Sequence, residues 1–110
     1  MRLTSKRPSK YRAKRVVVDG ERFHSRAEAS RHQHLKIRER MGEIRDLIRQ
    51  PRYVLHAKGG DKIGVVVMDW RYVVDGVGVV VEDKKGYDNP LSKWKRKHFE
   101  AEYRLKVLIT

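Results

Sequence analysis

The chain has 110 residues, which is enough for one domain with a single modest core. Its net charge of +13, from 27 Lys and Arg against 14 Asp and Glu, favours a polyanionic partner. Nucleic acid is the first candidate, because each neutralised phosphate releases counterions. An anionic membrane is less favoured, since we find no bilayer-spanning run and no hydrophobic signal peptide. The absence of cysteine excludes disulfides and thiolate sites, and we expect a cytoplasmic protein.

A dense run of positive charge opens the chain. Residues 1–15 carry seven basic side chains and no acid: Arg2, Lys6, Arg7, Lys10, Arg12, Lys14 and Arg15. Charge of this density rarely packs into a core, so we expect residues 1–14 to form a disordered arm that binds phosphate. The alternative is a solvated tail without a role. Residues 15–110 are predicted to form the folded domain.

A hairpin and a helix are predicted next. Asp19-Gly20 lies between two short β-prone runs, which is a hairpin signal. Ser25-Arg26-Ala27-Glu28 has the pattern of a capping box, in which Glu28 bonds the backbone of Ser25. The helix is expected to run to about Met41, with Gly42 as its stop.

Four β-rich segments follow, at 44–48, 52–57, 63–74 and 77–85. Asp75-Gly76 joins the last two segments into a hairpin. Their continuous valines predict strands that are covered on both faces, and therefore a hairpin at the centre of the sheet.

Asp88-Asn89-Pro90 is a strong helix start, so a second helix is expected from Pro90 to Tyr103, followed by a strand at 105–109. The order of elements predicts an α/β fold, with a single domain built on a central mixed β-sheet flanked by two helices.

Acidic residues end two of the valine-rich segments. Asp69 follows 65–68, and Glu82 and Asp83 follow 79–81. Because these segments form a hairpin, the acids are expected to lie side by side, and clustered carboxylates repel one another without a cation. Oxygen-only ligands suit Mg²⁺ or Mn²⁺. A lysine two residues after a carboxylate shares its face of the strand, where it can orient water or stabilise charge on a phosphate.

The length of the hairpin turn decides which residues meet. A strict two-residue turn pairs Val74 with Val77. Counting outward, Asp69 then faces Glu82, with Lys84 on the same face.

A three-residue loop gives the other register, and a glycine at position 78 suits the bulge that it requires. Val74 then pairs with Gly78. Asp69 meets Asp83 in this register, with Lys85 alongside.

This pattern resembles the PD-(D/E)XK nucleases, and in particular their small phage members, which include Holliday-junction-resolving endonucleases. The chain is also similar to a family of short phage proteins placed in that superfamily. The resemblance spans roughly residues 11–109 and is carried by Lys14-Arg15, Asp19-Gly20, Phe23-x-Ser25-x-x-Glu28, Gly42-Glu43-Ile44, Gln50-Pro51-Arg52-Tyr53, Met68-Asp69-Trp70 and Glu82-Asp83-x-Lys85-Gly86.

The resemblance implies a restriction-endonuclease-like fold and Mg²⁺-dependent hydrolysis of DNA, including branched DNA in phage recombination. It favours Asp83-x-Lys85 over the alternative with Glu82 and Lys84, because the lysine is followed by glycine. It also implies a homodimer, since a four-way junction has pseudo-twofold symmetry and needs two active sites.

Members of this superfamily usually carry a further acid on the first helix, and Glu28 matches that position. The resemblance thus implies catalytic roles for Glu28, Asp69, Asp83 and Lys85, with the three acids as metal ligands. Glu28 has an alternative role as the last residue of the capping box, where it need only bond backbone.

The second helix is rich in basic residues that surround an aromatic residue. Lys93, Lys95, Arg96 and Lys97 are candidate DNA-binding residues, together with Lys14 and Arg15. The alternative is a solvated helix face on which Trp94, Leu91 and Phe99 pack. The five histidines show no convincing zinc-ligand spacing.

A metal-dependent DNA endonuclease is therefore the leading hypothesis for the function. A non-catalytic nucleic-acid-binding module that keeps the nuclease fold is the alternative, because the basic arm and the second helix would suffice for binding. A structural phage protein or a membrane-surface protein that acts through charge alone is the third possibility.

Overall fold

The computed structural model describes residues 15–84 and 88–110. The predicted arm, with Lys14, and the predicted catalytic Lys85 lie outside the described residues. The described residues form two units, divided between His34 and Leu35, and each is described by itself.

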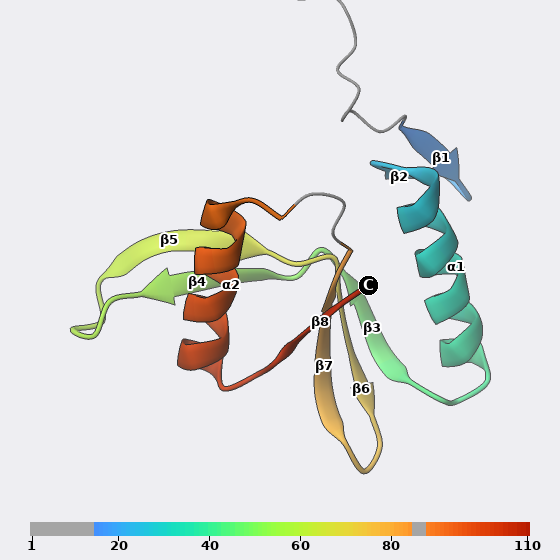
Figure 1. Cartoon of the computed structure of the whole chain (residues 1–110). Coiled ribbons are helices and arrows are strands. Elements are labelled where there is room, and N and C mark those ends of the chain that lie inside the picture. The colour runs from blue at the N-terminus through green and yellow to red at the C-terminus, as the bar shows by residue number, and fades with distance from the viewer. Residues whose placement is uncertain (1–14, 85–87) are drawn as a thin grey trace, which may run out of the picture. The chain divides into compact units, whose positions relative to one another are not determined.

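The first unit contains a short hairpin and the beginning of helix α1 (Figure 1). Strands β1 (Val16–Val18) and β2 (Glu21–Phe23) pair antiparallel, with Val18 opposite Glu21. Asp19 and Gly20 between them both have positive φ, of 50° and 80°. Two consecutive positive φ angles are the geometry of a tight hairpin turn, which confirms the hairpin predicted at Asp19-Gly20.

Helix α1 (Arg26–Arg40) begins and ends within one residue of the predicted positions. Its last turn is closed by hydrogen bonds from the backbone N–H of Gly42 to the carbonyl of Glu39 and from that of Glu43 to Arg38. Gly42 has a φ of +81°, which is the left-handed conformation expected of a glycine that stops a helix.

The second unit is built on a four-stranded mixed sheet with the order β3-β6-β7-β8. Its strands are β3 (Arg45–Arg49), β6 (Trp70–Val74), β7 (Gly78–Asp83) and β8 (Val107–Ile109). The pair β7 and β8 is parallel, whereas the other pairs are antiparallel. The β6–β7 hairpin lies at the centre of this sheet, and the predicted α/β class with a mixed sheet and two helices is confirmed (Figure 1).

One predicted strand is wrong, because the segment 63–74 is divided between two sheets. Its first part is β5 (Lys62–Val67), which pairs with β4 (Arg52–His56) in a separate two-stranded sheet, and its second part is β6. At the break, Met68 N–H donates to the carbonyl of Pro51, and Asp69 N–H donates to that of Glu82. Consecutive residues thus bond to different neighbours, and the chain passes from one sheet to the other.

Both faces of β7 are covered, as its continuous valines predicted. On one face Val80 packs against a core formed by Leu35, Ile44, Trp70 and Tyr72. On the other face, Val81 belongs to a core with Leu55, Met68 and Phe99. Apolar cover on two sides explains why the strand does not alternate polar and apolar residues.

Helix α2 (Pro90–Tyr103) has the predicted bounds and packs against β4 and β5 (Figure 1). Asn89 caps its first turn, because the side-chain oxygen accepts a hydrogen bond of 2.7 Å from the N–H of Ser92. Arg104 ends the helix in the left-handed conformation, and its N–H donates to the carbonyl of Glu100. Local cap chemistry therefore fixes both ends of this helix.

Replacing Tyr72 by Phe tests how much one buried polar contact contributes to the sheet. The Tyr72 hydroxyl donates to the carboxylate of Glu82, and both residues are almost fully buried. Losing a hydrogen bond to a charged group is expected to lower the free energy of unfolding by about 1.5–3 kcal/mol. Urea unfolding followed by circular dichroism measures this loss.

Tyr103→Phe is the matched control, because its hydroxyl donates to a neutral acceptor, the backbone carbonyl of Val54, at 2.7 Å. Its expected cost is smaller, about 0.5–1.5 kcal/mol. Equal losses in the two variants would show that the charge of Glu82 adds nothing to the contact with Tyr72.

Candidate functional site

The register of the β6–β7 hairpin settles the question of turn length. Val74 pairs with Gly78, so the connecting loop has three residues, and Trp70 pairs with Glu82. Gly78 has a φ of +112°, a conformation that side chains with a Cβ rarely adopt. The two-residue turn is wrong, and the register with the three-residue loop is confirmed.

This register brings Asp69 to the end of β7. The ladder ends at the pair of Trp70 with Glu82, so Asp69 and Asp83 are the next residues of the two segments beyond its last pair. Two hydrogen bonds fix the arrangement: Asp69 N–H donates to the carbonyl of Glu82 at 3.1 Å, and Lys84 N–H donates to Oδ2 of Asp69 at 2.7 Å. The backbone and the side chain of Asp69 are thus bound on both sides of Asp83.

Glu82 and Asp83 have opposite orientations, because successive side chains of a strand alternate between faces. Glu82 is fully buried and accepts the hydrogen bond of Tyr72, whose side chain belongs to the core of Leu35 and Ile44. Asp83 is 7% exposed and lies on the other face of the strand. The carboxylate of Glu82 therefore accepts a hydrogen bond within the core, whereas Asp83 lines a hollow on the opposite face of the strand.

The hollow beside Asp83 has a volume of about 270 Å³ and brings together residues of β5, β7 and α2. Its lining is Val65, Val66, Val67, Met68, Asp83, Ser92, Lys95 and Arg96. Two of the four basic residues predicted on the second helix are thus near the acid. Lys95 Nζ donates to the carbonyl of Val65 at 3.2 Å, which holds the ammonium group at this wall.

Arg96 is fixed by a two-bond contact with Asp88, at 2.7 and 3.1 Å. The hydrogen bond with Asp88 raises the pKa of Arg96 above its ordinary value, and the negative charge of Asp83 adds to this effect. The guanidinium therefore stays charged and oriented at the edge of the hollow.

Lys93 and Lys97 lie on the exposed side of α2 and do not line this hollow. Trp94 and Leu91 are exposed as well, at 52% and 60%, whereas Phe99 is fully buried. Under the alternative interpretation of this helix, all three are packing residues, and only Phe99 is buried. The basic residues of the helix thus form two groups, one beside Asp83 and one around Trp94.

Glu28, in the first unit, serves the start of α1. Its N–H donates to Oγ of Ser25 at 3.1 Å, and its Oε1 accepts a hydrogen bond of 2.9 Å from the N–H of His24. The predicted capping box is present, except that the carboxylate reaches the backbone of His24, one residue before the predicted Ser25. The proposed role of Glu28 as a metal ligand stays a prediction, because Asp69 and Asp83 belong to the other unit.

Within residues 15–84 and 88–110, no group of three or more His, Cys, Asp or Glu side chains is arranged to hold a metal ion. Asp69 and Asp83 supply two carboxylates at the end of β7. None of the helices in the described part of the chain is long and apolar enough to cross a membrane.

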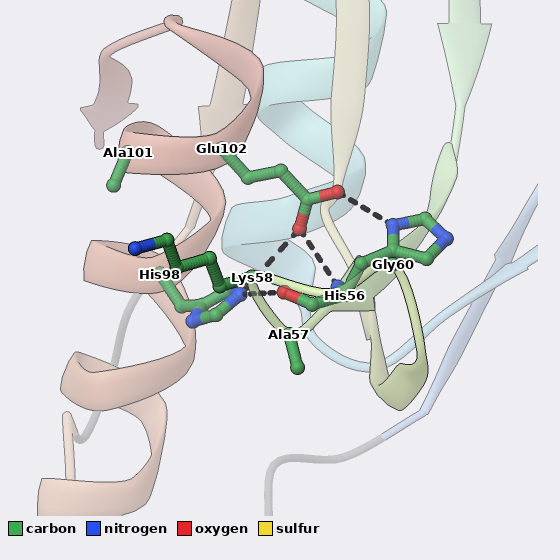
Figure 2. Close-up of a pocket in the computed structure, with 7 residues that line it drawn as sticks. All are labelled: His56, Ala57, Lys58, Gly60, His98, Ala101 and Glu102. Carbon is green, nitrogen blue, oxygen red and sulfur yellow. Dashed lines mark hydrogen bonds and ion pairs between the residues drawn. The ribbon is translucent and has the colours of Figure 1, made fainter.

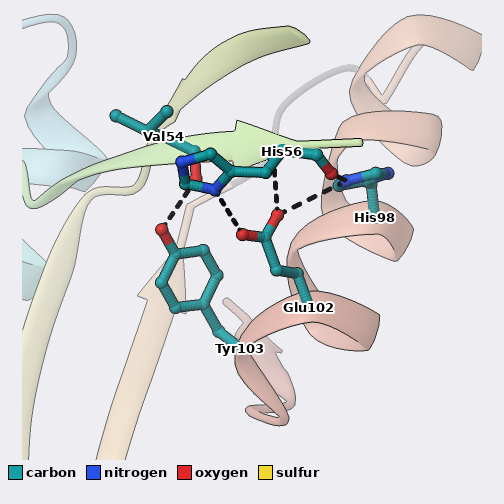
Figure 3. Close-up of polar contacts among 5 residues, drawn as sticks. All are labelled: Val54, His56, His98, Glu102 and Tyr103. Carbon is teal, nitrogen blue, oxygen red and sulfur yellow. Dashed lines mark hydrogen bonds and ion pairs between the residues drawn. The ribbon is translucent and has the colours of Figure 1, made fainter. Parts of the chain in front are cut away.

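The sequence pattern missed a second polar cluster, which joins the end of β4 to α2 (Figure 2). Both oxygens of Glu102 contact His56: Oε1 accepts from its backbone N–H at 2.8 Å, and Oε2 lies 2.5 Å from its ring Nδ1. The ring Nε2 of His98 lies 2.8 Å from the carbonyl oxygen of His56 and 3.4 Å from Oε1 of Glu102 (Figure 3). His98 and Glu102 are four residues apart on a helix, which is a local signal, but His56 comes from a distant strand.

This cluster borders a second, shallow hollow of about 540 Å³. Its lining is His56, Ala57, Lys58, Gly60, His98, Ala101 and Glu102 (Figure 2). Hydrogen bonds from His56, first from its backbone and then from its ring, lower the pKa of Glu102 below its ordinary value of 4.5. The charges of His56 and His98 act in the same direction.

Glu102→Gln should therefore change how stability depends on pH. A carboxylate with a lowered pKa stabilises the folded state above its ordinary pKa, and that contribution is lost as the pH falls through the lowered value. We expect the variant to be less stable than wild type at neutral pH and to lose less stability on acidification. Urea unfolding at a series of pH values from about 7 to about 3 measures both effects.

Glu43→Gln is the control for the loss of one negative charge, because the side chain of Glu43 is 50% exposed and pairs with Arg38. Parallel stability curves for wild type and Glu102→Gln would contradict the prediction.

Comparison with known proteins identifies a family but no characterised relative. Searches of curated proteins and of solved structures gave no match. The model of one protein family matches residues 8–109, and so spans the hairpin, both helices and all strands described above. The chain therefore belongs to the DUF1064 family, described as a protein family of unknown function.

Proposed function

We propose that this protein is a metal-dependent DNA endonuclease of the PD-(D/E)XK type, which hydrolyses phosphodiester bonds. The observation that carries the proposal is the buried Asp83, which lines a hollow together with Lys95 and Arg96. Asp69 forms hydrogen bonds with both sequence neighbours of Asp83, Glu82 and Lys84. A buried carboxylate beside a second one is costly unless cations compensate it. Two fixed basic groups and a bound metal ion would supply that compensation.

The donor set fits a hard divalent cation. Asp69 and Asp83 offer oxygen ligands alone, and Mg²⁺ is commonly held by one or two protein carboxylates, with waters and substrate phosphates completing its shell. Asp69 and Asp83 would hold Mg²⁺ or Mn²⁺, and Glu28 is the proposed third ligand. When bound, the ion would stabilise negative charge on the phosphate and lower the pKa of a coordinated water.

The chain's own residues would bind and orient the DNA. Lys95 and Arg96 present positive charge at the hollow, where the scissile phosphate would lie. Lys85, two residues after Asp83, is proposed to orient the attacking water or to stabilise charge on the phosphate. Lys93, Lys97, Lys14 and Arg15 would bind phosphates farther along the backbone.

From the resemblance to phage PD-(D/E)XK nucleases, we infer that the substrate includes branched DNA. Holliday junctions formed in phage recombination, in the bacterial cytoplasm, are an example. A junction has two symmetry-related strands to cut, so a chain of 110 residues would act as a homodimer with one site in each copy.

Asp83→Asn tests the proposal directly. The change keeps the shape of the side chain and removes the charge that would bind the metal, so cleavage should fall by about 100-fold or more. The assay incubates four-way junctions and linear duplexes with the protein and Mg²⁺ or Mn²⁺. Asp61→Asn, in an exposed turn of the same unit, is the matched control and should cleave like wild type.

Two outcomes would contradict the nuclease proposal: no cleavage by wild type on any DNA, or equal cleavage by Asp83→Asn. Absence of cleavage together with salt-sensitive DNA binding that Mg²⁺ does not change would favour a non-catalytic nucleic-acid-binding module. Calorimetric titration with Mn²⁺ separates the two functions independently, because only the nuclease requires a metal site.

A pair of variants separates the two roles considered for Glu28. Glu28→Gln keeps an oxygen acceptor for the N–H of His24 and removes the charge, so a metal ligand would lose at least about tenfold in cleavage while stability changes little. Ser25→Ala removes the acceptor for the N–H of Glu28 and should cost about 1 kcal/mol of stability with cleavage retained. Full activity in Glu28→Gln would leave this residue with its capping role alone.

A further inference from the structure

Trp94 is an exposed aromatic side chain that the candidate active site does not use. It is 52% exposed, whereas the only other tryptophan of the sequence, Trp70, is fully buried in the sheet core. Leaving a large aromatic ring in water sacrifices the free energy that its burial would give. An exposed tryptophan on a rigid helix is therefore a natural contact for a partner.

The ring of Trp94 packs against the ring of His98. Their centroids are 5.5 Å apart, with an angle of 36° between the planes. His98 is fixed in turn, because its Nε2 is within hydrogen-bond distance of the carbonyl oxygen of His56, in the cluster that Glu102 completes (Figure 3). The cluster thus orders the two adjoining rings of Trp94 and His98, called the aromatic platform below, before any partner binds. This order lowers the entropic cost of binding.

Two lysines lie close to Trp94 along the helix. Lys93 and Lys97, one residue before and three residues after Trp94, are both exposed on the same side of α2. Beyond His98, the shallow hollow of about 540 Å³ is bordered by Lys58 and Ala101 (Figure 2). An aromatic face beside two lysines suits a nucleobase and the phosphates that adjoin it.

We propose that Trp94, supported by His98, stacks on an unpaired nucleobase, and that Lys93 and Lys97 bind the adjoining phosphates. The hollow at Lys58 receives the next nucleotide of the strand. This inference rests on the nucleic-acid binding of the proposed function, not on its catalysis, and it adds single-stranded segments to the DNA that the protein recognises. Paired bases are already stacked inside a duplex and present only their edges, so a duplex gains nothing from the face of Trp94.

Tryptophan fluorescence reports on the contact, because Trp70 is inaccessible. The full chain is titrated in EDTA, which prevents cleavage, with an oligothymidylate or with a blunt duplex of the same length. The single strand should quench the emission of Trp94 and the duplex should quench it much less.

Binding is then compared by anisotropy of labelled DNA. Trp94→Ala should weaken the single-strand Kd by about 5- to 100-fold, the range of one lost stacking contact, and change the duplex Kd by less than about twofold. Trp94→Phe, which keeps an aromatic face, should recover most of the single-strand affinity. Leu91→Ala is the matched control, since Leu91 is an apolar side chain of the same helix with 60% exposure.

Lys97→Ala distinguishes charge from stacking. It should weaken single strand and duplex alike and reduce the slope of log K against log salt by about 1. Equal losses for both DNAs in Trp94→Ala, or absence of quenching by the single strand, would overturn the proposal.

The failure of this inference and that of the nuclease proposal are distinguishable. Selective quenching by single-stranded DNA, in a protein that cleaves no DNA, would support base stacking on Trp94 and refute the nuclease proposal. Metal-dependent cleavage that Asp83→Asn abolishes, in a protein whose Trp94→Ala variant binds single strands like wild type, would refute the platform alone.

Discussion

The backbone crossing at Met68 and Asp69 is the constraint on which the rest of the second unit depends. Met68 bonds to Pro51 in the chain that leads into β4, while Asp69 donates to Glu82 of β7 and accepts from the N–H of Gln50. Backbone groups in a protein interior must be paired, so the two sheets can separate here only because each residue finds a different neighbour. The separation opens the hollow under α2, and it sets Asp69 at the end of β7. The candidate site is a product of how the chain changes sheets.

The adjacent acids Glu82 and Asp83 show how one strand divides structural and chemical tasks. Both are buried, and burial of a carboxylate must be compensated by hydrogen bonds or by positive charge. Tyr72 satisfies Glu82 inside the core, whereas Asp83 lies among Lys95 and Arg96. Because side chains alternate along the strand, the contact of Glu82 with Tyr72 and the basic residues near Asp83 lie on opposite faces. Glu82 thus contributes to the stability of the core, and Asp83 contributes negative charge to the hollow.

Local signals in the sequence predicted both helices well, because the caps at Ser25, Gly42 and Asn89 depend only on neighbouring residues. The break in 63–74 escaped prediction, since it depends on Pro51 and Glu82, which are distant in sequence. The sequence left two possible registers for the β6–β7 hairpin, and Gly78 favoured the correct one. The pattern of residues alone does not determine whether the loop has two residues or three. The cluster of His56, His98 and Glu102 was missed for the same reason as the break, because His56 belongs to β4, which is distant in sequence from α2.

The three-residue loop at 75–77 has a consequence for how the family can change in evolution. It lies at the end of the hairpin remote from Glu82 and Asp83. Its length nevertheless determines which face of the strand each of these two acids occupies. A strand repeats every two residues, so one inserted or deleted residue that shifts β7 against β6 would exchange the faces of Glu82 and Asp83. Asp83 would then turn toward the face of Tyr72, and Glu82 toward the face of the hollow. Only changes that leave the register intact, such as loop insertions absorbed as longer excursions, are compatible with both faces.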